Sequence, residues 1–74
     1  MFKLSPPWAK YLTSQPEAGM GYQVATIRLK DGRVFERVVL VEGTVASIAN
    51  DPAIPFMETD IAEISVTNDV SWRA

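Results

Sequence analysis

The sequence predicts an all-β fold, a small barrel of about five strands built as a β-meander with a short helical turn at the N-terminus. Two observations carry this prediction. Segments in which polar and apolar residues alternate recur between residues 22 and 67, and such alternation is typical of half-buried strands. The pairs Asp31-Gly32 and Glu42-Gly43 separate these segments, and Asp-Gly between two alternating segments favours a β-hairpin.

The length of the chain limits it to one domain. With 74 residues it buries about 60% of the surface that the unfolded chain exposes, which suffices for one small core. We expect an N-terminal arm and loop at residues 1–21, a barrel at residues 22–67 and a tail at residues 68–74.

The N-terminal arm begins with a helix signal. A serine and two prolines at residues 5–7 suit the first turn of a helix, and Trp8, Tyr11 and Leu12 follow at helical spacing. We therefore expect one or two helical turns whose apolar side chains share a face. This face would lie over an open end of the sheet.

The first hairpin joins strands expected at residues 23–29 and 33–41. A three-residue loop with Gly32 in third place and a bulge sets Ile27 opposite Phe35, whereas a two-residue turn would set Ile27 opposite a glutamate. We favour the bulged turn, because it does not pair an apolar core position with a charge.

The second strand is apolar on both of its faces. The favoured register turns Phe35, Val39 and Val41 toward the core and leaves Val38 and Leu40 on the outer face. Only one face can enter the core of a small barrel, so the outer face must be covered. Either the N-terminal arm or a second copy of the chain could cover it, and the sequence leaves both alternatives open.

Five residues are candidates for an interface on this outer surface, because aromatic and aliphatic side chains anchor most protein contacts. The candidates are Trp8, Tyr11, Val38, Leu40 and Trp72. Whether the two tryptophans cover the barrel of their own chain or that of another copy stays open.

The remaining elements follow from turn formers and alternation. Residues 44–49 form the third expected strand, and a loop rich in turn formers follows at residues 50–55. A tight turn is expected at residues 57–60. The closing strand is expected at residues 61–67, with Ile64 and Val66 directed inward.

Segment 27–35 with its Asp31-Gly32 turn, a later Phe56 and a closing strand at residues 61–66 resemble the Sm-like and SH3-like small barrels. This resemblance implies a strongly bent barrel of five strands, often with a short N-terminal helix. It also implies assembly into rings or dimers through strand edges. In general character the chain is similar to small bacterial proteins as well, which implies no function.

The RNA-binding residues of Sm-like proteins have no counterpart in this chain. In that family an Asp/Asn pair follows the second strand, and an Arg-Gly or Lys-Gly step lies in the fourth. Here the first position holds Glu42-Gly43-Thr44, and the chain contains neither Arg-Gly nor Lys-Gly. The resemblance therefore assigns RNA binding to no residue.

Composition excludes several kinds of chemistry. The chain has no cysteine and no histidine. It therefore has no disulfide, no thiolate zinc site, no cysteine nucleophile and no histidine base for a serine triad. We predict no catalytic residues, no cofactor and no enzymatic activity.

Charge is divided unevenly along the chain. The formal net charge is −2, with six basic and three acidic residues in residues 1–41 and one basic and six acidic residues in residues 42–74. An acidic balance argues against a dedicated nucleic-acid binder, whose affinity comes largely from neutralised phosphates. The acids and bases either interleave on one surface or support association between a basic and an acidic face.

A nucleic-acid-binding barrel is the alternative function. Basic residues gather on the hairpin 28–37, where aromatic side chains could stack on the bases of a single strand. These residues are Arg28, Lys30, Arg33 and Arg37. Asp31 and Glu36 lower the charge of the same hairpin, so a solvated surface is the simpler interpretation.

A carboxylate metal site is a third alternative, built from Glu58, Asp60 and Glu63. The spacing matches no EF-hand loop, and residues 57–63 hold no glycine for the sharp turn of such a loop. A capping role for Asp60 is simpler, and we predict no metal ligands.

These observations predict a non-catalytic binding or assembly module that forms a homo-oligomer, either a dimer or a ring, with a further protein partner as an option. No apolar run reaches the roughly 18 residues of a membrane span, and residues 1–8 hold no signal-peptide core. We therefore expect a cytoplasmic protein of bacterial type without membrane contact.

Overall fold

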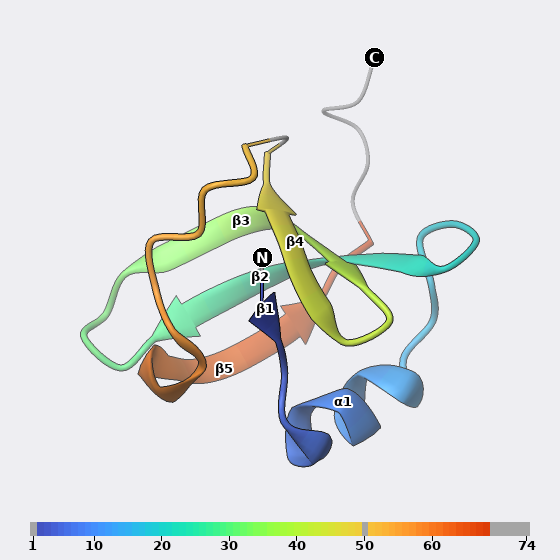
Figure 1. Ribbon diagram of the computed structural model, residues 1–74, viewed down its shortest axis with the longest axis horizontal. Coiled ribbons are helices and arrows are strands. Elements are labelled where there is room, and N and C mark those ends of the chain that lie inside the picture. Colours follow the sequence, from blue (N-terminus) through green and yellow to red (C-terminus); the bar gives the residue numbers. More distant parts are fainter. Residues whose placement is uncertain (1, 50, 69–74) are drawn as a thin grey trace.

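The computed structural model describes residues 2–49 and 51–68 of the chain. This part of the chain contains five strands, one α-helix and one turn of 3-10 helix (Figure 1). In chain order these are β1 (Phe2–Lys3), α1 (Pro6–Thr13), β2 (Tyr22–Leu29), β3 (Val34–Val41), β4 (Thr44–Ile48), η1 (Glu58–Asp60) and β5 (Ile61–Val66).

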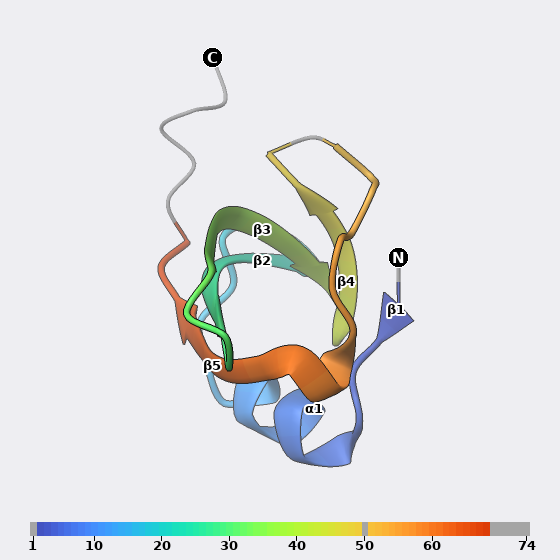
Figure 2. The same cartoon turned by 90° about the vertical axis from the view of Figure 1, so that its left-hand side faces the viewer.

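The strands form one antiparallel sheet in the order β1-β4-β3-β2-β5. The sheet curls into a half-barrel, and α1 lies below the curl in Figure 2. The all-β class, the barrel-like curl and the short N-terminal helix are therefore confirmed. Strand β1 has no counterpart in the sequence pattern, because its two residues are too few to show a period.

The hairpin between β2 and β3 has the expected register. Ile27 pairs with Phe35, and the Leu29 N–H donates a hydrogen bond to the Arg33 carbonyl oxygen at 2.8 Å. Gly32 adopts a φ of 96°, a left-handed conformation that glycine enters at little cost. The bulged turn that keeps a charge away from Ile27 is confirmed.

A second bulge, in the middle of β3, exchanges the inward and outward side chains of that strand. The register with β2 shifts between Ala25 and Ile27, so that Glu36 and Arg37 share one position opposite β2. Arg37 adopts a φ of 60°, and its carbonyl oxygen accepts a hydrogen bond from the Ala49 N–H at 2.9 Å. An extra residue in a strand turns every later side chain to the other face.

The expected outer position of Val38 and Leu40 is therefore wrong. Both residues are 0% exposed, whereas Val41, expected in the core, is 40% exposed. A period of two counted from Phe35 cannot reveal the bulge, because its left-handed position holds Arg37 and not a glycine.

The core lies inside the curl and continues beneath the N-terminal arm. Leu4 and Leu12 are buried and join the buried side chains of the strands. The ring of Phe56, from the loop after β4, packs against Phe2 and Phe35 with centroids 6.0 and 5.2 Å apart. The arm and this loop therefore complete a core that the sheet alone leaves open.

The β3 bulge predicts opposite sensitivities for two neighbouring residues. Leu40→Ala should lower the free energy of unfolding by about 2–5 kcal/mol, because it leaves a cavity in the core. Val41→Ala should lower it by less than about 1 kcal/mol, because its side chain already contacts solvent. Urea denaturation of both variants measures the difference. A larger loss in Val41→Ala would contradict the bulge.

Candidate functional site

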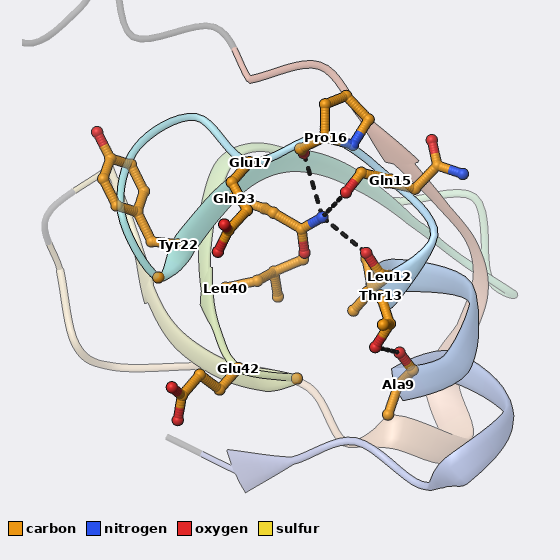
Figure 3. Close-up of a pocket in the computed structure, with 12 residues that line it drawn as sticks. Ala9, Leu12, Thr13, Gln15, Pro16, Glu17, Tyr22, Gln23, Leu40 and Glu42 are labelled. Atoms are coloured by element: carbon orange, nitrogen blue, oxygen red, sulfur yellow. Dashed lines mark hydrogen bonds between the residues drawn. The ribbon is translucent and has the colours of Figure 1, made fainter.

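A groove lies where α1, the loop of residues 14–21 and the turn between β3 and β4 meet (Figure 3). Its volume is about 580 Å³, within the range of sites that hold small ligands. Its apolar lining includes Leu12 and Leu40, and its polar lining includes Glu17, Gln23 and Glu42. Six of the twelve lining residues carry polar or charged side chains, so the groove is about as polar as it is apolar.

Gln23 connects β2 to the C-terminal end of α1. Its side chain is only 7% exposed, and its Nε2 donates hydrogen bonds to the carbonyl oxygens of Leu12 at 2.8 Å, Gln15 at 3.2 Å and Pro16 at 3.2 Å. Leu12 lies in the last turn of α1, and Gln15 and Pro16 lie in the loop that follows, so this amide links β2 to the end of the helix and to that loop. Gln23 therefore fixes the position of α1 over the sheet.

The same amide leaves its oxygen on the groove side. Figure 3 shows the three hydrogen bonds converging on the Gln23 nitrogen, while the oxygen points away from the end of α1. No described residue donates a hydrogen bond to this oxygen, and the described chain has no buried side-chain oxygen that lacks a partner. Gln23 Oε1 is therefore not fully enclosed, and Gln23 is one of the residues that line the groove.

Two carboxylates also line the groove. Glu17 comes from the loop after α1 and Glu42 from the turn after β3, and both residues are exposed. Glu42 and Gly43 form a two-residue turn with φ values of 49° and 77°, a conformation that hairpins favour because it follows the twist of the strands. No arginine or lysine lies among the described residues that line the groove.

The structure separates the predicted interface residues. Trp8 is partly buried and packs against the core of its own chain, and Tyr11 is exposed on α1. Val38 and Leu40 lie in the core, where no partner could reach them without unfolding β3. Trp72 lies outside the described residues. A role of Trp8 or Tyr11 in an interface stays a prediction.

The basic hairpin is partly neutralised by its own acids. Arg33 Nε lies 2.8 Å from an Asp31 carboxylate oxygen, and its guanidinium lies over the Phe35 ring. Arg28 Nε lies 3.7 Å from a carboxylate oxygen of Glu63 on β5. These contacts occupy side chains that would otherwise face phosphates, so they do not favour a nucleic-acid surface.

Lys30 and Arg37, the other two basic candidates, are exposed and lie apart in the hairpin. Lys30 follows the last residue of β2, and its backbone N–H donates to the Asp60 carbonyl oxygen at 2.8 Å. Arg37 occupies the β3 bulge and lines a separate small pocket with Val24 and Thr67. The four basic side chains thus stand at different points of the hairpin, and nucleic-acid binding by them stays a prediction.

The acidic residues around η1 have structural partners. Glu58 accepts a hydrogen bond from the Ser5 N–H, and Asp60 accepts one from the Met57 N–H at 2.9 Å. Among the residues that the structure describes, no three acidic, histidine or cysteine side chains gather closely enough to hold a metal ion. Glu58 instead ties the N-terminal arm to the start of β5.

Asp31 has a lowered pKa within the β2–β3 turn. The largest cause is the hydrogen bond that the Arg33 backbone N–H donates to its carboxylate at 3.0 Å. The Arg33 guanidinium, at 2.8 Å, lowers the pKa further, while burial acts in the opposite direction. Both hydrogen bonds favour the charged carboxylate that shapes the turn.

No family model matches this chain, and neither the curated proteins nor the solved structures contain a match. Within residues 2–49 and 51–68, the longest helix, α1, has eight residues, and no helix there is long and apolar enough to cross a bilayer. The case for a function therefore rests on the geometry of the fold.

The groove was not evident from sequence patterns, although one signal for it exists. Gln23 is a polar residue within an otherwise apolar part of β2 and is buried next to Val24 and Ala25. A buried polar residue needs a partner, and the C-terminal end of the preceding helix is the nearest source of unpaired carbonyls. That reasoning locates the helix but not the space beside it.

Removing the Gln23 amide should destabilise the protein. Gln23→Met keeps most of the side-chain volume but removes the donor that Leu12 of α1 shares with Gln15 and Pro16 of the following loop, so we expect a loss of about 1–3 kcal/mol in the free energy of unfolding. Gln15→Met is the matched control, expected to change it by less than about 0.5 kcal/mol. Thermal and urea denaturation measure both, and equal losses would contradict the role of Gln23.

The Asp31 pKa gives a prediction for pH. Its folded value lies below the ordinary 3.8, so its stabilising effect is complete above the unfolded pKa and is lost as pH falls through the folded pKa. Arg33→Gln should raise the Asp31 pKa but leave it below 3.8, because the backbone hydrogen bond remains. Carbon-detected NMR of the carboxyl group during a pH titration measures this. An unchanged pKa would contradict a contribution of the guanidinium.

Proposed function

We propose that this protein is a non-catalytic assembly module that forms a homodimer through the outer edge of β5. The supporting observation is that β5 ends the sheet order and pairs with β2 on one side only. Its outer edge has no partner strand in the described chain. An unpaired edge offers a row of backbone N–H and C=O groups to another strand.

The pattern of hydrogen bonds between β2 and β5 identifies the groups at this edge. The Thr67 N–H donates to the Val24 carbonyl oxygen at 2.9 Å, and Ser65 lies opposite Thr26. Because alternate residues of a strand direct their backbone groups to opposite sides, the N–H and C=O groups of Ile64 and Val66 face the open edge. These residues supply the donors and acceptors for a second copy.

The opposite side of the sheet is less available. Strand β1 covers the first part of β4, where Phe2 pairs with Val45 and Lys3 with Thr44. At the other end of β4, Ile48 pairs with a residue of the following loop. A ring requires two different free edges, whereas an antiparallel β5–β5 pair uses one edge twice. This difference supports a twofold dimer over a ring.

The resemblance to Sm-like and SH3-like barrels supports the same proposal. It implies assembly through strand edges, and the curled antiparallel sheet with a helical turn before its last strand is compatible with it. The proposal for this chain needs no RNA, because the hairpin carries acids beside its bases. A cytoplasmic location is part of this proposal, and the fold does not bear on it.

The first test is the mass of the protein in solution. Size-exclusion chromatography coupled to light scattering at about 100 µM, a concentration at which a pair of modest affinity forms, should give twice the 8.2 kDa of one chain. Amide exchange of Ile64 and Val66 should slow as the protein is concentrated, because the dimer pairs their N–H groups. A monomer at this concentration would contradict the proposal.

A pair of variants at one position then tests the edge. Val66→Ala removes side-chain atoms but keeps the outward N–H, so it should remain dimeric. Val66→Pro removes that N–H and places a ring at the edge, so it should be monomeric at the same concentration. Circular dichroism checks that both variants are folded. Dimers of equal stability for both variants would place the interface elsewhere.

A further inference from the structure

We infer that the groove between α1 and the β3–β4 turn is a binding site for a ligand that carries a guanidinium or primary ammonium group. This site goes beyond the proposed assembly function. No residue of β5 lines the groove, so the two proposals depend on different residues. Gln23, the acids of the groove and its volume together suit such a ligand.

Gln23 offers an acceptor whose identity is fixed by its other contacts. Nitrogen and oxygen of an amide can be exchanged in a structure, but three backbone carbonyl oxygens surround one end of this amide. Carbonyls only accept hydrogen bonds, so that end must be the NH₂ group. The end that faces the groove is therefore the oxygen, and it selects a donor.

Two carboxylates add negative charge to this acceptor. Glu17 and Glu42 line the groove, and no basic residue accompanies them among its described lining residues. A carboxylate accepts hydrogen bonds and does not donate them when ionised, so all three groups select for donors. Bonds between an ionised carboxylate and an ammonium or guanidinium are about twice as strong as neutral ones.

The apolar lining suits the rest of such a ligand. Leu12 and Leu40 are 2% and 0% exposed, so the accessible apolar surface of the groove comes from half-buried Ala9 on α1 and from exposed Pro16 in the following loop. Long basic groups carry an aliphatic stem, which packs on apolar surface while the charged end reaches polar partners. A volume of about 580 Å³ holds a stem of this kind with room for neighbouring atoms.

A divalent metal ion fits these groups less well. Magnesium and calcium ions take six or more oxygen ligands, and calcium sites draw several of them from carboxylates. No group of three acidic, histidine or cysteine side chains suited to a metal occurs in the part of the chain that the structure describes. The groove has acceptors enough to orient an organic cation but too few charged ligands for such an ion.

The test uses two probes with the same cationic group. Butylguanidine represents a small free guanidinium with an aliphatic stem, and acetyl-Gly-Arg-Gly-amide represents an arginine of the same single charge within a peptide. In an NMR titration of the full chain, at least one probe should bind saturably and shift the Gln23 side-chain NH₂ signals and the Glu17 and Glu42 amides. The tighter probe identifies the source of the cation. Norvaline amide, blocked at its amino group and uncharged, should not bind.

Substitutions of exposed acids locate the site. The double variant Glu17→Gln with Glu42→Gln should weaken binding at least fivefold, and binding should weaken as salt rises, because ions screen exposed carboxylates. Glu36 is an exposed acid of the β2–β3 hairpin and lies away from these two residues in sequence. Glu36→Gln should therefore leave the affinity unchanged. None of these changes touches the β5 edge, so the dimer should persist.

Three results would overturn the inference. The first is that neither probe binds saturably. The second is that Glu36→Gln weakens binding as much as the double variant, because the attraction would then come from overall charge. The third is that calcium or magnesium ions produce the Gln23 and Glu42 shifts at lower concentration than either probe. Each can occur with the dimer intact, so failure here is distinct from failure of the assembly proposal.

Discussion

The bulge in β3 is the constraint on which the remaining structure depends. Before it, Phe35 points into the curl, and after it Val38 and Leu40 do so, because Glu36 and Arg37 share one position opposite β2. The left-handed conformation of Arg37 costs about 1–2 kcal/mol relative to an ordinary strand residue. The gain is that large apolar residues on both sides of the bulge enter the same core.

The bulge also changes which apolar side chains of β3 are buried. A regular strand would bury one face, and the other would need a partner. In this chain the inward face changes partway along the strand, so Val38 and Leu40 are covered by their own fold. Val34 and Val41 of β3 remain 55% and 40% exposed, so the bulge does not remove the outer apolar surface of this strand. The dimer proposal rests on the open edge of β5.

Local sequence signals predicted the strands. Long-range contacts were not predicted, and neither was the left-handed conformation of Arg37, which no glycine indicates. The β2–β3 turn was predictable because Gly32 marks its left-handed position. The β3 bulge was not, because Arg37 is the residue in that conformation. Strand β1 depends on contacts with β4, far along the chain, that no local pattern encodes. The groove depends on where α1 lies, which the buried Gln23 amide determines through three carbonyls.

The positions of the charged residues in the hairpin decide which acids are paired with bases and which are not. Some acids and bases interleave, as in the contacts of Asp31 with Arg33 and of Arg28 with Glu63. The groove carboxylates are different, because Glu42 lies at the end of the β2–β3 ladder opposite to the turn that holds Arg33.

Strands of eight residues separate those two ends by roughly 25 Å, at about 3.3 Å per residue. Ions screen exposed charges beyond about 8 Å at physiological salt, so the bases at the turn contribute little to the field at the groove, whereas Lys10 on α1 and Lys3, which pairs with Thr44, lie on elements next to it. The attraction for a cation that we propose therefore depends on Glu17 and Glu42, the two acids that line the groove. A ligand that enters it meets Gln23, the residue that holds α1 on the sheet. Ligand binding and the stability of the N-terminal arm therefore both depend on the same amide.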